Sequence, residues 1–353
     1  MVVQMLKLII SLLFITTSSF ASETDQYMAW GQNIKDSLPT FNKIVNEKLQ
    51  DVVQKASANR KCIDLADDFM GALENSPSLR KITKFEFQNS TSGYEVDIYP
   101  PESVSKRDFI NASIHYKQEN ANRVKEPART IKISAVLLGA DKLTHFVTIG
   151  RNYHARYQKC ITRGMSEIEA MTFTIDDGII NESGRLGLKW GTFSLADLEA
   201  NFQGMMLARS LCEKDNPNLK KINGKWAIDH PINFAKFITP YLDESFNYNH
   251  FKMKKWVPAI AVIKNKYCDM RDNEEVISRL EYYSSFNESF SNKYVKNILE
   301  QKYLVEEKEF QEKISSIDLS SEDGIKIFNK LMYKRDYPRS WKNQSIDAIC
   351  DLP

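Results

Sequence analysis

Glycine and proline are scarce in this chain, which has 13 glycines and 11 prolines among its 353 residues. Folds built mainly from β-strands need many tight turns, and these two residue types supply a large share of turn positions. The shortage therefore predicts a mainly α protein with one large helical domain. Internal repeats and low-complexity segments are absent as well, which excludes a solenoid and a collagen-like or disordered chain.

An excess of one charge sign is also missing. Lysine and arginine number 48 and the acidic residues 46, which gives a formal net charge of +2. Proteins that bind nucleic acid usually carry a strong basic surface. We therefore expect no nucleic-acid partner.

Long apolar runs are absent after the first residues, whereas a membrane-spanning helix needs roughly 20 apolar residues. Residues 1–21 contain Lys7, then an apolar run over residues 8–15, and then Ser19-Phe20-Ala21. This order is typical of a signal peptide that is cleaved after a small residue. We expect a signal peptide at residues 1–21, a periplasmic or secreted location, and no transmembrane segment after cleavage.

Cysteine pairs of the C-x-x-C type are absent, so neither a redox dithiol nor a zinc ribbon is indicated. The five cysteines are widely spaced: Cys62, Cys160, Cys212, Cys268 and Cys350. Export to an oxidising compartment favours one or two disulfides. Their pairing stays open, and the odd number leaves at least one thiol unpaired within the chain.

Hydrophobic periodicity organises the rest of the chain. Apolar residues recur at helical spacing through much of residues 22–80, whereas alternating apolar and polar residues around the turn-forming NSTSG predict a small β-hairpin near 82–99. A long helix is expected from Ile131 to Arg163. In order, the predicted segments are the signal peptide (1–21), N-terminal helices with the hairpin (22–130), a helical core (131–270) and a C-terminal helical extension (271–353).

The predicted core helix carries a narrow polar stripe. At the spacing of an α-helix, Asp141, His145, Thr148 and Asn152 fall within about 60° of one another. Apolar residues occupy most of the remaining surface, so the stripe is expected to be buried. Buried polar groups need hydrogen-bond partners.

A second predicted helix offers such partners. Ser194, Asp197 and Asn201 lie on one face, and Ser194 has the features of an N-cap residue. Gly204 follows at the same spacing, where a small residue permits close helix packing. We expect the two helices to pack with their polar stripes facing each other.

Two interpretations of these stripes stay open. In the first, Asp141 orients His145 as a general base, and Asp197, Glu182 and Asn201 complete a catalytic or binding site. In the second, the stripes form a buried hydrogen-bond network that fixes helix register without catalysis. The strong catalytic signatures H-E-x-x-H and G-x-S-x-G and the Walker loop are all absent.

A metal version of the first interpretation would place a divalent cation in the same cluster. Its candidate ligands are His145, Asp141, Asp197 and Glu182. Three nitrogen or oxygen ligands with one water suit zinc or manganese. A divalent metal is therefore a candidate cofactor.

The segment DKLTHF, followed about 50 residues later by SLADLEANFQG, resembles a pattern of VanZ-like and YfiM-type bacterial envelope proteins. The pattern is D-K-x-x-H-F … S-x-x-D-x-x-x-N-x-x-G, and the resemblance covers residues 135–210. The matched positions are Asp141, Lys142, His145, Phe146, Ser194, Asp197, Asn201 and Gly204, with Glu182 as the counterpart of a glutamate between the two blocks. VanZ-like proteins cross the membrane several times, and this sequence departs from them there.

The resemblance implies a bacterial envelope setting and a functional role for the matched residues. It does not specify a reaction. Our first hypothesis is a hydrolase acting on an envelope lipid or glycan, with His145, Asp141 and Asp197 as catalytic residues and Glu182, Asn201, Lys142 and Ser194 as binding residues. The alternative is a non-catalytic envelope protein whose polar stripes are structural or bind a ligand. A solvent-open pocket over His145 would favour the hydrolase, and a sealed, fully paired stripe would favour the alternative.

One further segment carries polar residues among aromatic ones. In residues 233–256, Asp243, Glu244, Asn247 and His250 either border a cleft or belong to an aromatic-rich loop packed on the core.

Overall fold

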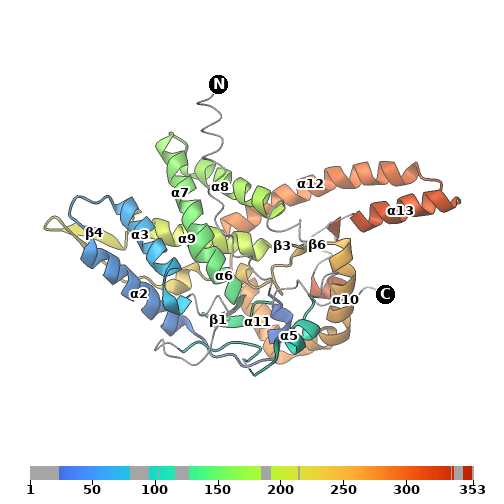
Figure 1. Cartoon of the computed structure of the whole chain (residues 1–353), viewed down its shortest axis with the longest axis horizontal. Coiled ribbons are helices and arrows are strands. Elements are labelled where there is room, and N and C mark those ends of the chain that lie inside the picture. Colours follow the sequence, from blue (N-terminus) through green and yellow to red (C-terminus); the bar gives the residue numbers. More distant parts are fainter. Residues whose placement is uncertain are drawn as a thin grey trace.

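The computed structural model describes residues 24–79, 95–101, 103–115, 127–183, 192–213, 215–334, 336–337 and 345–351. Helices predominate among these residues and the strands are short, so the predicted mainly α class is confirmed (Figure 1). The signal peptide expected at residues 1–21 and most of the hairpin expected near 82–99 lie outside the described residues. Of that hairpin, residues 95–99 are described. Residues 95–98 are not in a strand, and Tyr99 forms an isolated antiparallel bridge with Thr130.

The N-terminal part contains the amphipathic helices that the spacing of apolar residues predicts. Its helical elements are η1 (Gln26–Ala29), α2 (Leu38–Lys55), α3 (Cys62–Glu74) and α5 (Lys106–Ala112). Pro39 stands in the first turn of α2, where its missing N–H needs no intrahelical partner. One face of α2 is buried through Phe41, Ile44, Val45, Leu49 and Val53.

The structure corrects the prediction for residues 131–139, which form a β-hairpin and not the first turns of a helix. Strand β1 (Thr130–Ile133) pairs antiparallel with β2 (Val136–Gly139). Ser134 and Ala135 both have positive φ and form the two-residue turn. Such turns usually contain Asn-Gly or Asp-Gly, so the sequence carries no strong hairpin signal here.

The helix that follows β2 contains a π-helical turn. Its parts are α6 (Ala140–Thr144), the π turn η3 (His145–Ile149) and α7 (Gly150–Thr162). A π turn holds more residues than an α turn, so the residues after it are rotated relative to the expected stripe. Asp141, before the turn, and His145, at its start, are buried as expected, whereas Asn152, after it, is exposed.

Helix α9 (Leu195–Ser210) packs against η3 and α7, and it is buried along almost its whole length. Ser194 caps its N-terminus, as predicted, by accepting a hydrogen bond from the backbone N–H of Asp197. The helices approach closely at Gly150 and Gly204. A Cβ atom on Gly204 would lie 1.8 Å from the carbonyl oxygen of Phe146.

The other elements complete the helical body. Helix α8 (Glu167–Asn181) begins with a capping box formed by Ser166 and Glu169. Two small antiparallel sheets also occur: β4 (Leu219–Ile222) with β5 (Lys225–Ile228), and the order β3 (Thr192–Phe193), β6 (His250–Lys252), β7 (Asp336–Tyr337). Asn223 and Gly224, both with positive φ, form the turn of the β4–β5 hairpin.

The C-terminal part is helical, as expected. Its elements are η6 (Phe234–Phe237), η7 (Pro240–Leu242), α10 (Met253–Lys266), η8 (Cys268–Asp272), α11 (Glu274–Ser284), α12 (Phe290–Ser315), α13 (Glu322–Lys334) and α14 (Ile346–Cys350). Helices α12 and α13 extend away from the rest of the molecule (Figure 1).

Two disulfides link distant elements, in line with the expected one or two. Cys62 of α3 is joined to Cys212, just after α9, and Cys268 of η8 is joined to Cys350 of α14. Cys160 is a buried free thiol. The disulfides therefore fix α3 to the core helix α9 and α14 to the end of α10.

Each large hydrophobic cluster contains residues that are distant in the sequence. The largest joins Phe41 of α2 to Ile131 of β1 and to Tyr283 of α11. A second joins Tyr153 of α7 to Leu299 of α12. Hydrophobic contacts thus cross the boundaries expected near residues 131 and 271, and the division into segments stays a prediction.

Among the described residues, none of the helices combines the length and the apolar character that crossing a bilayer requires.

The close approach of α9 leads to a testable prediction. Replacing Gly204 by alanine should destabilise the protein by about 1–3 kcal/mol or more, because the added methyl group meets the backbone at Phe146. Urea unfolding followed by circular dichroism measures the loss. Met206→Leu on the same helix conserves volume and should cost less. Equal stability of Gly204→Ala and the wild type would contradict the close contact.

Candidate functional site

The polar residues of the two predicted stripes meet in the interior. Helix α6 supplies Asp141 and Lys142, and the π turn supplies His145. Helix α9 faces them with Asp197 and Asn201. All five residues are buried, so their polar groups depend on one another for hydrogen bonds.

Lys142 is the centre of this cluster. Its ammonium nitrogen lies 2.7 Å from Asp141 Oδ2, 2.7 Å from Asp197 Oδ1 and 2.6 Å from Glu244 Oε1. The lysine side chain is 0% exposed. An ammonium group has three hydrogens to donate, and each can meet a different carboxylate here. We call Lys142 and these three acids the lysine cluster.

The sequence prediction did not include two residues in this arrangement. Glu244 comes from the loop after η7, and Thr24 precedes η1. The hydroxyl of Thr24 donates a hydrogen bond to Asp141 Oδ1. The only sequence signal for Glu244 was its position among polar residues in an aromatic segment. That segment has no helical periodicity, so its sequence does not indicate which side chains face the core.

His145 has contacts at both ring nitrogens. Its Nδ1 lies 3.2 Å from Asn201 Oδ1, and its Nε2 lies 3.2 Å from Asp197 Oδ2. The contacts of Asp141 are instead with Lys142 and Thr24. Asp197, rather than Asp141, is therefore the carboxylate that orients His145.

Ser194 and Glu182 lie beside the cluster, at the start of α9. The Ser194 hydroxyl donates to Glu244 Oε1 at 2.9 Å, and the Ser194 backbone N–H donates to Glu182 Oε1 at 3.2 Å. Glu182 thus holds the backbone where α9 begins. The structure brings every predicted site residue into one region, with Glu182 at its edge.

The charges in the cluster shift the titration of two acids in opposite directions. Burial alone would raise the pKa of Asp197, but the charges of His145 and Lys142 outweigh burial and hold this pKa below its usual value. Burial raises the pKa of Glu244 to about 7, although Lys142 opposes the shift. Glu244 is therefore the acid that most readily takes up a proton near neutral pH.

The carboxylate oxygens of the lysine cluster test the prediction of a divalent metal. Single carboxylate oxygens of Asp141, Asp197 and Glu244 lie within 4.8 Å of one another, as ligands around one cation would. Three oxygens suit magnesium or manganese better than zinc. The ammonium of Lys142 already lies among these oxygens, and its positive charge opposes a second cation there. The residues therefore do not fit a resident divalent metal.

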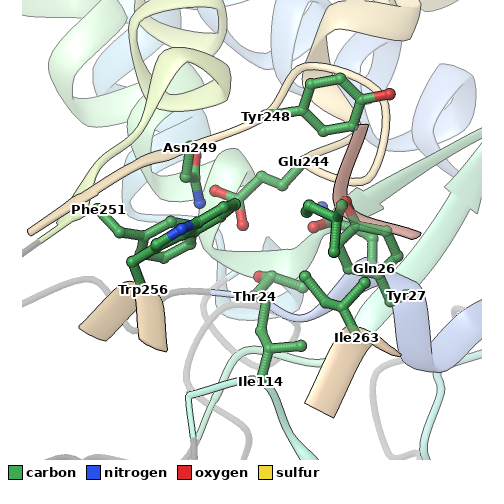
Figure 2. A pocket seen from close by; sticks show the side chains of 11 residues that line it. Thr24, Gln26, Tyr27, Ile114, Glu244, Tyr248, Asn249, Phe251, Trp256 and Ile263 are labelled. Atoms are coloured by element: carbon green, nitrogen blue, oxygen red, sulfur yellow. The ribbon is translucent and has the colours of Figure 1, made fainter. Parts of the chain in front are cut away.

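The remaining residues of the aromatic segment are also buried. Asp243 accepts hydrogen bonds from Ser245 and from Tyr283, and the Asn247 side chain donates to the Tyr241 carbonyl. His250 stacks edge-on with Phe193. These three residues pack in the core, whereas Glu244 lines a small pocket (Figure 2).

Removing the central charge should be costly. We predict that Lys142→Met lowers the free energy of unfolding by about 3–5 kcal/mol at neutral pH, because it leaves three buried carboxylates without their common cation. Urea unfolding measures the change. Lys159→Met, at an exposed position of α7, is the matched control. A Lys142→Met protein as stable as this control would refute the role given to the ammonium.

The raised pKa of Glu244 predicts a pH dependence of stability. Its value of about 7 in the folded protein exceeds the ordinary value of 4.5 in the unfolded chain. The folded state therefore binds the proton more tightly, and stability should fall as pH rises from about 4.5 to about 7. Glu244→Gln removes this contribution, so its stability should fall less over that range.

The measurement for Glu244 is a set of urea-unfolding curves between pH 4.5 and 8. Other buried acids, such as Asp25, contribute in the same direction, so the difference between wild type and variant is the relevant quantity. Glu309→Gln, on the exposed surface of α12, should follow the wild-type curve. Parallel curves for wild type and Glu244→Gln would contradict the prediction.

Comparisons with known proteins do not add to the geometry. No family model, no curated protein and no solved structure matches the chain. The resemblance to VanZ-like and YfiM-type envelope proteins therefore depends on the matched motif alone and stays a prediction.

Proposed function

We propose that this chain is an exported, non-catalytic protein of the bacterial envelope, in which the lysine cluster and His145 hold the helical core together. The observation that supports this proposal is the complete burial of the Lys142 ammonium among three carboxylates. A catalytic lysine or a metal site would need one position open to substrate or water. Here three carboxylate oxygens already lie within 2.7 Å of the ammonium nitrogen.

The environment of His145 supports the same proposal. A general base needs a free nitrogen within reach of the substrate proton. Both ring nitrogens of His145 have protein partners, and its side chain is only 8% exposed. A paired and sealed histidine suits a structural network.

Export is supported by two independent features. The first is the order of residues at the beginning of the sequence, which is typical of a signal peptide. The second is the pair of disulfides, Cys62–Cys212 and Cys268–Cys350, since such bonds persist mainly in oxidising compartments. A periplasmic or secreted location agrees with both.

A hydrolase acting on an envelope lipid or glycan is the second candidate. One observation favours it: the 3.2 Å contact between His145 Nε2 and Asp197 is the arrangement of a histidine with its orienting acid. In this version His145 is the base and Asp197 its orienting partner, while Asn201 contacts the other ring nitrogen. An opening movement would have to expose His145 to substrate.

A thermal melt of the His145→Ala variant distinguishes the two candidates. In a structural network the substitution leaves Asp197 and Asn201 with unpaired groups, so stability should fall by about 1–3 kcal/mol. Residues kept for catalysis often reduce stability, and their removal then leaves the melting temperature unchanged or raised. An unchanged or raised melting temperature would therefore favour the hydrolase.

The control is His230→Ala, because His230 is half-buried and lies outside the cluster. Both variants and the wild type are melted with and without a chelator. Destabilisation of the wild type alone by the chelator would show that a metal is bound through His145, and it would overturn the proposal. Mass spectrometry of protein from the periplasmic fraction tests export through loss of residues 1–21.

A further inference from the structure

The β4–β5 hairpin projects from the molecule at the end of the long axis opposite helices α12 and α13 (Figure 1). Its strands are joined by Asn223 and Gly224, which both have positive φ. Residues 220–225 are all exposed. A Cβ atom on Gly224 would meet no described atom within 4 Å. The tip of this hairpin is therefore open to a partner.

The hairpin is fixed to the helices beside it. The indole N–H of Trp226 donates to the Arg60 carbonyl at 3.1 Å, which connects β5 to the turn between α2 and α3. The Trp226 side chain also packs against the largest hydrophobic cluster. The disulfide between Cys62 and Cys212 joins the start of α3 to the segment before β4. The hairpin and the α2–α3 turn consequently form one edge of the molecule.

Positive charge without acidic residues distinguishes this edge. Residues 55–61 and 219–228 contain six lysines and arginines and no aspartate or glutamate. The whole chain, in contrast, has a formal net charge of only +2. We call these two segments the basic edge. Such a local excess of one sign attracts a partner of the opposite sign.

Most of these charges are not neutralised by neighbouring acids. Arg60 pairs with Asp68, and Lys220 pairs with Asp229. The other four basic side chains belong to exposed residues, and none of the described acids forms an ion pair with them. These four residues are Lys55, Lys61, Lys221 and Lys225. They can therefore be neutralised by a partner from outside the chain.

An apolar side chain stands among these lysines at the tip. Ile222 is the last residue of β4 before the turn, and it is 47% exposed. Lys221 precedes it in the chain, and Lys225 pairs with it across the hairpin. Trp226 lies behind them, with the Lys221 ammonium 5.0 Å from the centre of its ring. Apolar, cationic and tryptophan side chains together are typical of surfaces that meet the boundary of a bilayer.

The size and shape of the edge also favour a bilayer. A stable protein interface uses about 20–30 residues on each side, which is more than the basic edge contains. A projecting hairpin tip cannot enclose a small ligand, because such ligands bind in concave sites. A bilayer needs neither a large area nor a cavity, since shallow apolar insertion and attraction to anionic headgroups act together there.

We propose that the basic edge attaches this protein peripherally to an anionic lipid bilayer. Ile222 enters between the lipid headgroups, and the four unpaired lysines face the lipid phosphates. The attachment goes beyond the proposed role of the lysine cluster and does not depend on it, because no residue of the basic edge belongs to that cluster. Helices α12 and α13, at the opposite end, would then point away from the bilayer (Figure 1).

The two kinds of contact respond differently to salt. Each lysine close to an anionic surface should strengthen binding about fivefold, and this attraction is screened as the ionic strength rises. Burying the side chain of Ile222 should strengthen binding about tenfold, with little dependence on salt. Ionic strength therefore separates the charge contribution from the apolar one.

The experiment is co-sedimentation of the full mature chain with lipid vesicles. One set contains equal parts of phosphatidylglycerol and phosphatidylcholine, and the other contains phosphatidylcholine alone. We expect binding to the anionic vesicles at low salt, at least tenfold weaker binding at high salt, and no detectable binding to the neutral vesicles. Absence of binding to the anionic vesicles at low salt would overturn the proposal, and so would equal binding to both sets.

Charge variants locate the binding surface. The double variant Lys221→Gln with Lys225→Gln should bind anionic vesicles about 25-fold more weakly at low salt, since two lysines are lost. The matched control is Lys308→Gln with Lys330→Gln, at exposed positions of α12 and α13. It changes the net charge equally and should bind like the wild type. Equal weakening by both double variants would show a general charge effect and refute the assignment to the hairpin.

An apolar variant tests insertion. Ile222→Ser should weaken binding about tenfold at low and at high salt. Its control is Ile327→Ser on α13, where the isoleucine is 52% exposed and lies far from the hairpin (Figure 1). All the substituted side chains are exposed, so the thermal melts of the variants should match that of the wild type.

An acidic polypeptide is the competing partner, and polyglutamate is the probe for it. Calorimetric titration compares polyglutamate with anionic vesicles at equal concentrations of negative charge. We expect weaker binding of polyglutamate, and no effect of Ile222→Ser on it. Polyglutamate binding as tight as vesicle binding, together with vesicle binding that Ile222→Ser leaves unchanged, would identify an acidic protein surface as the partner and overturn the lipid assignment.

Discussion

The structure depends on one buried ammonium group. A lysine charge without access to water is strongly destabilising unless nearby acids neutralise it, and Lys142 has three within hydrogen-bond distance. These acids come from α6, from α9 and from the loop after η7, so the ammonium fixes the relative positions of three segments distant in sequence. The polar contacts of His145 and Ser194 depend on this arrangement. His145 contacts Asp197 and Ser194 donates to Glu244, and Lys142 fixes the position of both acids.

Close helix packing and the lysine cluster support each other. Gly150 and Gly204 bring the backbones of α7 and α9 together, and side chains of ordinary length can then pair across the gap one or two turns away. Asn201 and Asp197 reach His145 for this reason. A larger residue at either glycine would separate the helices and lengthen polar contacts that tolerate little change. The small residues and the charged ones thus form one structural unit.

Much of this arrangement can be predicted from the sequence, and the exceptions have physical causes. Helical spacing placed Asp141 and His145 on one buried face, and Asp197 and Asn201 on another, since the members of each pair are four residues apart. It did not show that His145 contacts Asp197 rather than Asp141. The same spacing failed beyond the π turn, where Asn152 is exposed. The β1–β2 hairpin carries no Asn-Gly signal, and its turn relies on Asp36, whose carboxylate accepts from the N–H groups of Ser134 and Ala135. Glu244 belongs to a loop, where no periodicity indicates which side chains turn inward.

The third hydrophobic cluster has a consequence for the order of folding. It joins Tyr27 and Trp30, early in the chain, to Ile346 and Ile349 of α14. Closing so long a loop carries an entropic cost, and residues near position 350 are synthesised after all the other parts of this cluster. The cluster is therefore completed only after these residues have been made, together with the bond between Cys268 and Cys350. Until then the thiol of Cys268 has no native partner and is available to oxidants and to disulfide exchange.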